Sequence, residues 1–155
     1  MKSLTILSLI LFFGFAKAQT ETHIEIQQSI VRMYDELFSK ADISTFDKYF
    51  VDEVVMFEDG FIFTADSIRS KVIGMKANME AERLKGNQLE RQNQFEFIGT
   101  SIEGNSAFVF FKSSAGFLYN GMRILTVNRL ESARFIKRDG LWKISFLHSS
   151  SIKEN

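Results

Sequence analysis

Few side chains in this chain of 155 residues are suited to covalent or metal chemistry. There is no Cys, and His23 and His148 are the only histidines, so a zinc or copper site would lack ligands. Gly-x-Ser-x-Gly, Gly-x-Gly-x-x-Gly and Walker sequences are also absent, which excludes the usual hydrolase elbow and phosphate loops. The serines that follow His148 are typical of a strand end rather than of a nucleophile turn. What remains is acid–base chemistry by carboxyl, phenol and imidazole groups, with no metal and no cofactor.

Composition limits the class of protein further. Lys and Arg together number 19, as do Asp and Glu, so the formal net charge is zero and no basic surplus points to nucleic acid. Apolar residues make up 45% and charged residues 25%, which is an ordinary globular balance and excludes a disordered chain. The length suits one domain.

The N-terminus has the features of a secretory signal peptide. A basic start at Met1-Lys2 precedes an apolar stretch over 4–15, and Ala16-Lys17-Ala18 gives the small-x-small pattern of a cleavage site. The apolar stretch is shorter than the roughly 20 residues that span a membrane. We therefore predict a signal peptide over 1–18, cleaved before Gln19, and a single domain over 19–155. The protein is expected to be exported, periplasmic or secreted, with no stable membrane anchor after cleavage.

The first half of this domain is predicted to be mainly helical. A capping box at Thr22-x-x-Glu25, followed by apolar residues at helical spacing, predicts a long helix from about 21 to 40. The elements expected after it are a short helix capped by Asp42 or Ser44, a strand over 53–57, a turn at Asp59-Gly60, a strand over 61–63, and a helix from Thr64 or Asp66 to Gly86.

From Leu89 onward the pattern is that of strands. The run 107–111 is continuously apolar, as in a strand covered on both faces, and 122–137 predicts another long strand. Asp139-Gly140 predicts a hairpin into 141–151, on which alternation gives one face to Trp142, Ile144, Phe146 and His148. The fold class is therefore α+β, with three N-terminal helices on a curved antiparallel sheet.

This order of elements resembles the nuclear transport factor 2-like superfamily, the cone-shaped, cystatin-like fold that ketosteroid isomerase and SnoaL-like polyketide cyclases share. The stretches that carry the resemblance are 37–42, 50–60 and 135–144, followed by His148-Ser149. The resemblance covers the whole predicted domain. It implies an apolar cavity between helices and sheet, a small apolar ligand as partner, and a homodimer formed through the sheet.

The ketosteroid isomerase branch implies specific roles. Tyr34 falls where that family keeps the tyrosine that donates to the substrate oxyanion, and Glu58 falls where it keeps its carboxylate base. Glu131 falls near the second acid of the oxyanion hole, and His148 falls at a strand position that faces the cavity. Both acids are Glu here where that family has Asp.

The implied set is chemically sound. A tyrosine and a neutral acid can hold a developing enolate, while an ionised carboxylate moves a proton between carbons. Desolvation must raise the pKa of Glu131 above its ordinary value of about 4.3 if that residue is to donate. Alternatively, Tyr34 and His148 with one carboxylate could run a dehydration.

Each of these residues also has a structural alternative. Tyr34 could be a core tyrosine whose hydroxyl is tied to a neighbour, and Glu58 a solvated turn acid. Glu131 could pair across strands with Arg123, Arg129 or Arg134, and His148 could be a satisfied core histidine. Lys and Arg are scattered among acids, which indicates a solvated surface.

Two functions remain open. The first is an exported small-molecule-binding domain with an apolar pocket and no assigned catalysis. The alternative is a cofactor-free acid–base enzyme, an isomerase, cyclase or dehydratase, that acts on a small apolar carbonyl compound. In either case we expect Tyr34, Glu58 and His148 to share one pocket. Its apolar lining is expected to come from Phe57, Phe97, Phe108, Phe110, Trp142 and Phe146.

Overall fold

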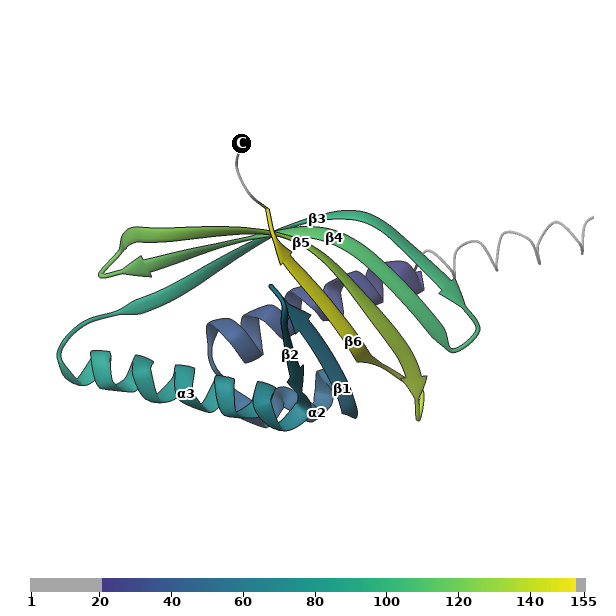
Figure 1. Cartoon of the computed structure of the whole chain (residues 1–155), viewed down its shortest axis with the longest axis horizontal. Coiled ribbons are helices and arrows are strands. Elements are labelled where there is room, and N and C mark those ends of the chain that lie inside the picture. Colours follow the sequence, from purple (N-terminus) through teal and green to yellow (C-terminus); the bar gives the residue numbers. More distant parts are fainter. Residues whose placement is uncertain (1–20, 153–155) are drawn as a thin grey trace, which may run out of the picture.

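The computed structural model describes residues 21–152, so the predicted signal peptide lies outside the described residues. The helical segments of this part of the chain end by Leu84, with two strands ahead of the last helix, and they lie against one face of a curved, six-stranded sheet (Figure 1). The α+β class is therefore confirmed. No helix among the described residues is long and apolar enough to span a membrane.

The first helix covers most of the predicted range but changes its winding near the end. It is α-helical over 21–33 and continues as a π-helical turn, η1 (Tyr34–Ser39), which the Lys40 N–H closes by donating to the Asp35 carbonyl at 3.0 Å. Buried residues on this helix include Ile26, Ile30 and Met33, at the spacing of a single helical face. The winding matters because Tyr34 and Phe38 in η1 form part of the candidate site.

Two short helical pieces and one long helix follow. Asp42 caps η2 (Ile43–Thr45) by accepting from the Ser44 N–H at 3.1 Å, and α2 (Phe46–Tyr49) continues from it. Thr64 caps α3 (Ala65–Leu84) through a capping box with Ser67. Only Ile68 and Val72 of α3 are fully buried, and in its C-terminal half Met75 and Met79 pack partly buried against the core.

The sheet consists of β1 (Phe50–Glu58), β2 (Phe61–Thr64), β3 (Leu89–Glu103), β4 (Ser106–Tyr119), β5 (Met122–Arg138) and β6 (Leu141–Ser151). Their order is β2-β1-β6-β5-β4-β3. All neighbours are antiparallel except β1 and β6, which run parallel. The prediction of an antiparallel sheet is corrected for this pair, because the pairing joins the two ends of the sheet-forming sequence and no local turn signals it.

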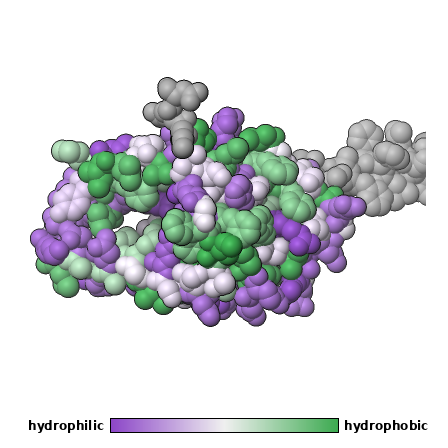
Figure 2. Space-filling view, viewed as in Figure 1, coloured by the Kyte–Doolittle hydropathy of each residue, from purple (hydrophilic) through white to green (hydrophobic). Residues whose placement is uncertain are grey.

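The hairpin turns follow from residues that tolerate positive φ. Asp59-Gly60 has φ of 48° and 89°, and Asp139-Gly140 has 52° and 79°, as in a type I′ turn. Asn120-Gly121, with 52° and 78°, makes a third such turn between β4 and β5. We call the strand ends beside this turn (residues 89–91, 117–119 and 122–125) the arm. Figure 2 shows the molecule hollowed between the arm and α3.

Candidate functional site

Glu131 is a carboxylic acid placed in the core by strand alternation. It points to the helix side of β5 together with Ala133 and Phe135, and only 2% of it is exposed. The Tyr34 hydroxyl donates to Oε2, and the Ser113 hydroxyl donates to Oε1. Each carboxylate oxygen therefore has its own donor inside the protein.

Burial changes the acidity of both members of this pair. Desolvation raises the pKa of Glu131, although the hydrogen bonds from Ser113 and Tyr34 and the charge of Arg129 oppose the rise. Desolvation and the neighbouring Glu131 raise the pKa of Tyr34 well above its ordinary value. Tyr34 consequently stays protonated and donates to Glu131 at any working pH.

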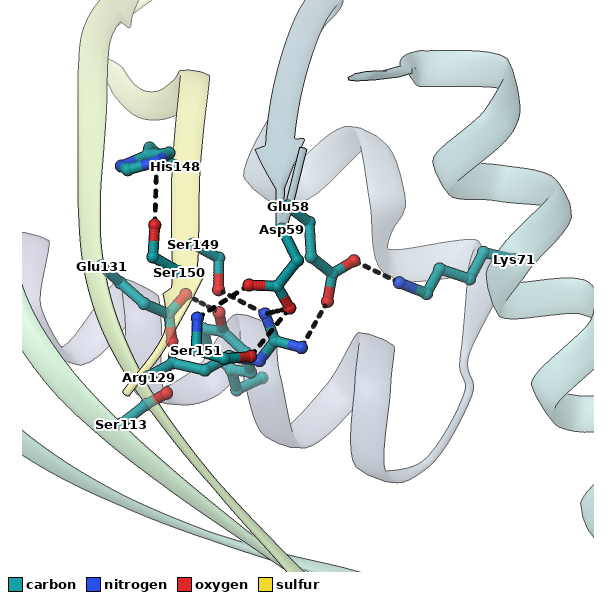
Figure 3. A network of polar contacts seen from close by, with 11 residues as sticks. Glu58, Asp59, Lys71, Ser113, Arg129, Glu131, His148, Ser149, Ser150 and Ser151 are labelled. Carbon is teal, nitrogen blue, oxygen red and sulfur yellow. Dashed lines mark hydrogen bonds and ion pairs between the residues drawn. The ribbon is translucent and has the colours of Figure 1, made fainter. Parts of the chain in front are cut away.

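Arg129, two residues before Glu131 on β5, connects that strand with β1 and β6. Its Nη2 lies 3.1 Å from Glu58 Oε1, and its Nη1 lies 3.0 Å from Asp59 Oδ2 (Figure 3). The same Nη1 donates to the Ser149 hydroxyl at 3.2 Å. Lys71 of α3 pairs with the other oxygen of Glu58. Glu58 is thus held between two cations rather than solvated as a turn acid.

Asp59 fixes the end of β6 onto the β1–β2 turn. Its Oδ1 accepts from the Ser151 N–H at 2.7 Å and its Oδ2 accepts from the Ser151 hydroxyl at 2.8 Å. These bonds and the nearby Arg129 lower the pKa of Asp59. The ionised carboxylate therefore stabilises the parallel pairing of β1 with β6.

A small cavity opens beside these groups, and we call it the polar cavity. Its volume is about 60 Å³. Its polar lining consists of Tyr34, Glu58, Lys71, Arg91, Arg129 and Ser149, and its apolar lining of Phe38, Met56 and Met75. Glu131 is not part of this lining, because Tyr34 stands in front of it.

A larger cavity, the apolar hollow, lies next to it between α3 and the arm. It has a volume of about 280 Å³ and shares Phe38, Met75 and Arg91 with the polar cavity. Its remaining lining is Ser39, Asn78, Met79, Leu89, Glu90, Phe117, Leu118, Ile124 and Leu125. The two cavities are therefore adjacent, one charged and the other apolar, with these three residues lining both.

The structure brings together three of the four predicted catalytic residues. Tyr34 and Glu131 are in contact, and Tyr34 and Glu58 line the same cavity. His148 is exposed, and Figure 3 shows its ring pointing away from Arg129. The expectation that Tyr34, Glu58 and His148 share one pocket is wrong for the histidine. Its Nε2 is paired with the Ser150 hydroxyl at 3.1 Å instead.

A β-bulge explains the misplacement of His148. Phe135 pairs with Ile144, but Arg134 pairs with Phe146, so Ser145 is an extra residue on β6. Beyond the bulge the alternation is reversed: Leu147 and Ser149 are buried, while His148 is exposed. A prediction that continues the alternation of side chains through Ser145 therefore places the residues at the end of β6 on the wrong face of the sheet.

The predicted aromatic lining is corrected as well, because none of its six members lines either cavity. Phe57 and Phe146 contact each other at 5.2 Å between ring centres, and Phe57 is 41% exposed on the outer face of the sheet. Phe108 and Phe110 are exposed on that face too, because no layer covers β4 there. The other two, Phe97 and Trp142, pack in the core.

Two arginines of the site were not predicted. Arg91 was assigned with the other basic residues to a solvated surface, and Arg129 was considered only as a structural partner of Glu131, yet both line the polar cavity. The signal was their place in the strand alternation, since Arg91 has the same parity as Phe95 and Phe97 and Arg129 the same parity as Glu131. A charged residue at a strand position whose side chain faces the core indicates a candidate functional site.

No set of metal ligands is found in this part of the chain. Within residues 21–152, no group of three or more His, Asp or Glu side chains is placed to hold a metal ion. The chemistry that the arrangement can support is binding of a small molecule, or proton transfer by Glu58, Tyr34 and Glu131.

Comparison with known proteins gives similarity in structure without similarity in sequence. No family sequence model matches the chain, and no curated protein does. An NTF2-like protein with a cystatin-like fold from Novosphingobium aromaticivorans superposes with a TM-score of 0.70 at 16% identity, covering 100% of this chain and 94% of that one. An NTF2-like superfamily protein from Salmonella enterica gives 0.69 at 17% identity, covering 88% and 95%.

A protein from Streptomyces avermitilis, described as a proposed dehydratase of the NTF2-like family, gives a TM-score of 0.61 at 16% identity, covering 87% of this chain and 99% of that one. Identities this low establish architecture and leave activity open. The helices, the curved sheet and these neighbours together show that the chain has the NTF2-like, cystatin-like fold.

Proposed function

We propose that this protein binds a small, largely apolar molecule between α3 and the arm, with no assigned catalysis. The observation that supports this proposal is that the apolar hollow lies next to the polar cavity and shares Phe38, Met75 and Arg91 with it. An apolar cleft with a few convergent polar groups is the usual form of a ligand site. The N-terminal sequence supports the further proposal that binding takes place outside the cytoplasm; an intact mass beginning at Gln19 would test it.

Two measurements test the binding proposal. Native mass spectrometry of the chain purified from its own host should find a retained small molecule. In addition, the neutral fluorescent probe N-phenyl-1-naphthylamine should bind, and Met79→Trp should weaken its binding about tenfold or more by filling the hollow. Ile73→Trp is the matched control, because Ile73 lies on α3 but lines neither cavity. An unchanged affinity in Met79→Trp would contradict the proposal.

A second candidate is a cofactor-free acid–base enzyme acting on a small carbonyl compound. What favours it is that Glu58, a carboxylate, and Tyr34, a phenol, line one cavity. Glu58 would remove a proton, and Tyr34 would donate to the resulting enolate after leaving Glu131. Deuterium exchange from solvent into small cyclic ketones, followed by NMR, would detect this activity. Glu58→Gln should abolish the exchange, and equal exchange in both proteins would exclude this role for Glu58.

A further inference from the structure

Three cations, Lys71, Arg91 and Arg129, line the polar cavity or the apolar hollow, and among residues 21–152 Arg91 is the one of the three that pairs with no carboxylate. Its Nε donates to Asn93 Oδ1 at 2.8 Å, and its two terminal nitrogens have no hydrogen-bond partner within the described part of the chain. The carboxylates nearby have other partners. Glu58 is held by Lys71 and Arg129, and Glu131 by Tyr34 and Ser113. Glu90, which lines the hollow, accepts from Gln88 Nε2 at 2.5 Å.

Aromatic rings hold the Arg91 guanidinium in place. Its central carbon lies 5.3 Å from the ring centre of Tyr34, 5.7 Å from that of Phe38 and 5.5 Å from that of Phe117. Burial lowers the pKa of Arg91, but an arginine side chain remains charged in proteins. The charges of Glu131 and Glu58 act on the guanidinium, but neither carboxylate contacts it, so an anion that enters the cavity can pair with it directly.

We infer that the ligand of this site is a small amphipathic carboxylate, with its carboxylate group on Arg91 and its apolar part in the apolar hollow. The inference rests on the proposed binding function and specifies the class of ligand. The free terminal N–H groups of a guanidinium match the two oxygens of a carboxylate. Because Arg91 lines both cavities, one molecule can contact it and extend into the hollow.

The charge and size of the site restrict this class further. Of the charged residues that line the polar cavity, Lys71 and Arg129 are paired with Glu58 or Asp59, which leaves the positive charge of Arg91 for the ligand. The hollow of about 280 Å³ is near the lower limit of ligand pockets, which is roughly 300 Å³. A short fatty acid or an aryl acid fits this description.

Three ligands with the same tail and different head groups test the inference. The full chain is titrated with octanoate, octanol and octylamine by isothermal titration calorimetry. Octanoate should bind about tenfold or more tightly than octanol, because a charge-assisted bidentate hydrogen bond is stronger than a neutral one. Octylamine should bind more weakly than either, because its charge has the same sign as that of Arg91.

The variant Arg91→Met keeps an unbranched apolar stem and removes the charge. It should lower the affinity for octanoate about tenfold or more and so abolish the preference for octanoate over octanol. Arg138→Met is the matched control, because Arg138 is exposed, pairs with Glu53 at 3.2 Å and lines neither cavity. Thermal unfolding reports whether each variant is folded, and the head-group comparison on the unaltered chain needs no variant.

Three results would overturn the inference: equal affinity for octanoate and octanol, no binding of octanoate by a chain that binds N-phenyl-1-naphthylamine, or an unchanged preference for octanoate in folded Arg91→Met. Each of these leaves the binding proposal intact. Failure of the neutral probe and of all three octyl compounds to bind would instead refute the binding proposal itself.

Discussion

The buried pair of Tyr34 and Glu131 makes a quantitative prediction about stability. Tyr34→Phe removes the donor to Oε2 and leaves one oxygen of a buried carboxylate without a partner. A hydrogen bond to a charged group contributes roughly 1.5–3 kcal/mol, so the variant should lose about 2 kcal/mol of unfolding free energy at pH 8. For a domain of this size that corresponds to a fall in Tm of roughly 8 °C.

The acidity of Glu131 gives this prediction a pH dependence. Burial raises the pKa of Glu131 in the folded state above the ordinary value of 4.5. The folded chain therefore holds this proton more tightly than the unfolded chain, and the contribution of Glu131 to stability is fully present below 4.5 and falls as pH rises. Glu131→Gln removes the ionisable group, so its stability relative to the unaltered chain should rise between pH 4 and pH 8.

A double-mutant cycle separates the two effects. Urea unfolding of the unaltered chain, Tyr34→Phe, Glu131→Gln and the double variant is followed by the fluorescence of Trp142, the only tryptophan. The Tyr34→Phe change should cost only about 1 kcal/mol beside a neutral Gln, which gives a coupling free energy of about 1 kcal/mol at pH 8 and less at pH 4. The reasoning is refuted if the coupling is the same at both pH values, or if Glu131→Gln loses relative stability as pH rises.

Three further predictions concern the surroundings of this pair. Arg129→Met should lower the free energy of unfolding by about 1–2 kcal/mol, because Glu58 and Asp59 lose an ion-pair partner that is only one-fifth exposed. Urea unfolding measures this loss, and a value below about 0.5 kcal/mol would contradict a stabilising role for these ion pairs. His148→Ala should change the free energy of unfolding by less than about 0.5 kcal/mol, since the His148 ring lies on the outer face of the sheet. Binding of N-phenyl-1-naphthylamine should be unchanged, and weaker binding would place His148 in the site. The homodimer through the sheet stays a prediction: sedimentation equilibrium should show a dimer that Phe110→Asp converts to a monomer, and a monomeric unaltered chain would refute it.

Much of the fold follows from local sequence signals. The capping residues Asp42 and Thr64 begin their helices, and Asp59-Gly60 and Asp139-Gly140 make the expected hairpin turns. Glu131 reaches the core because β5 alternates without a bulge from Arg129 to Phe135. Where the alternation is uninterrupted, a residue's face can be predicted from its parity alone.

The rest could not be predicted because it depends on features that leave no mark in a single sequence. Ser145 is a bulge without the glycine that often signals one, so the faces of Phe146 and His148 were reversed. Phe108 and Phe110 are apolar and yet exposed, and composition alone does not tell a covered face from an uncovered one. The π-helical turn at Tyr34 and the parallel pairing of β1 with β6 depend on contacts between distant segments.

The contrast between Glu131 and Arg91 favours the proposal of ligand binding over that of acid–base catalysis. Both are charged side chains on the inner face of the sheet, but Glu131 has a donor for each oxygen whereas Arg91 keeps its terminal nitrogens free. A substrate oxyanion could recruit Tyr34 only by breaking its bond to Glu131 and leaving that acid unsatisfied, which costs roughly 1–3 kcal/mol. An anion could recruit Arg91 without breaking any bond. The geometry therefore favours binding at Arg91 over catalysis at Tyr34.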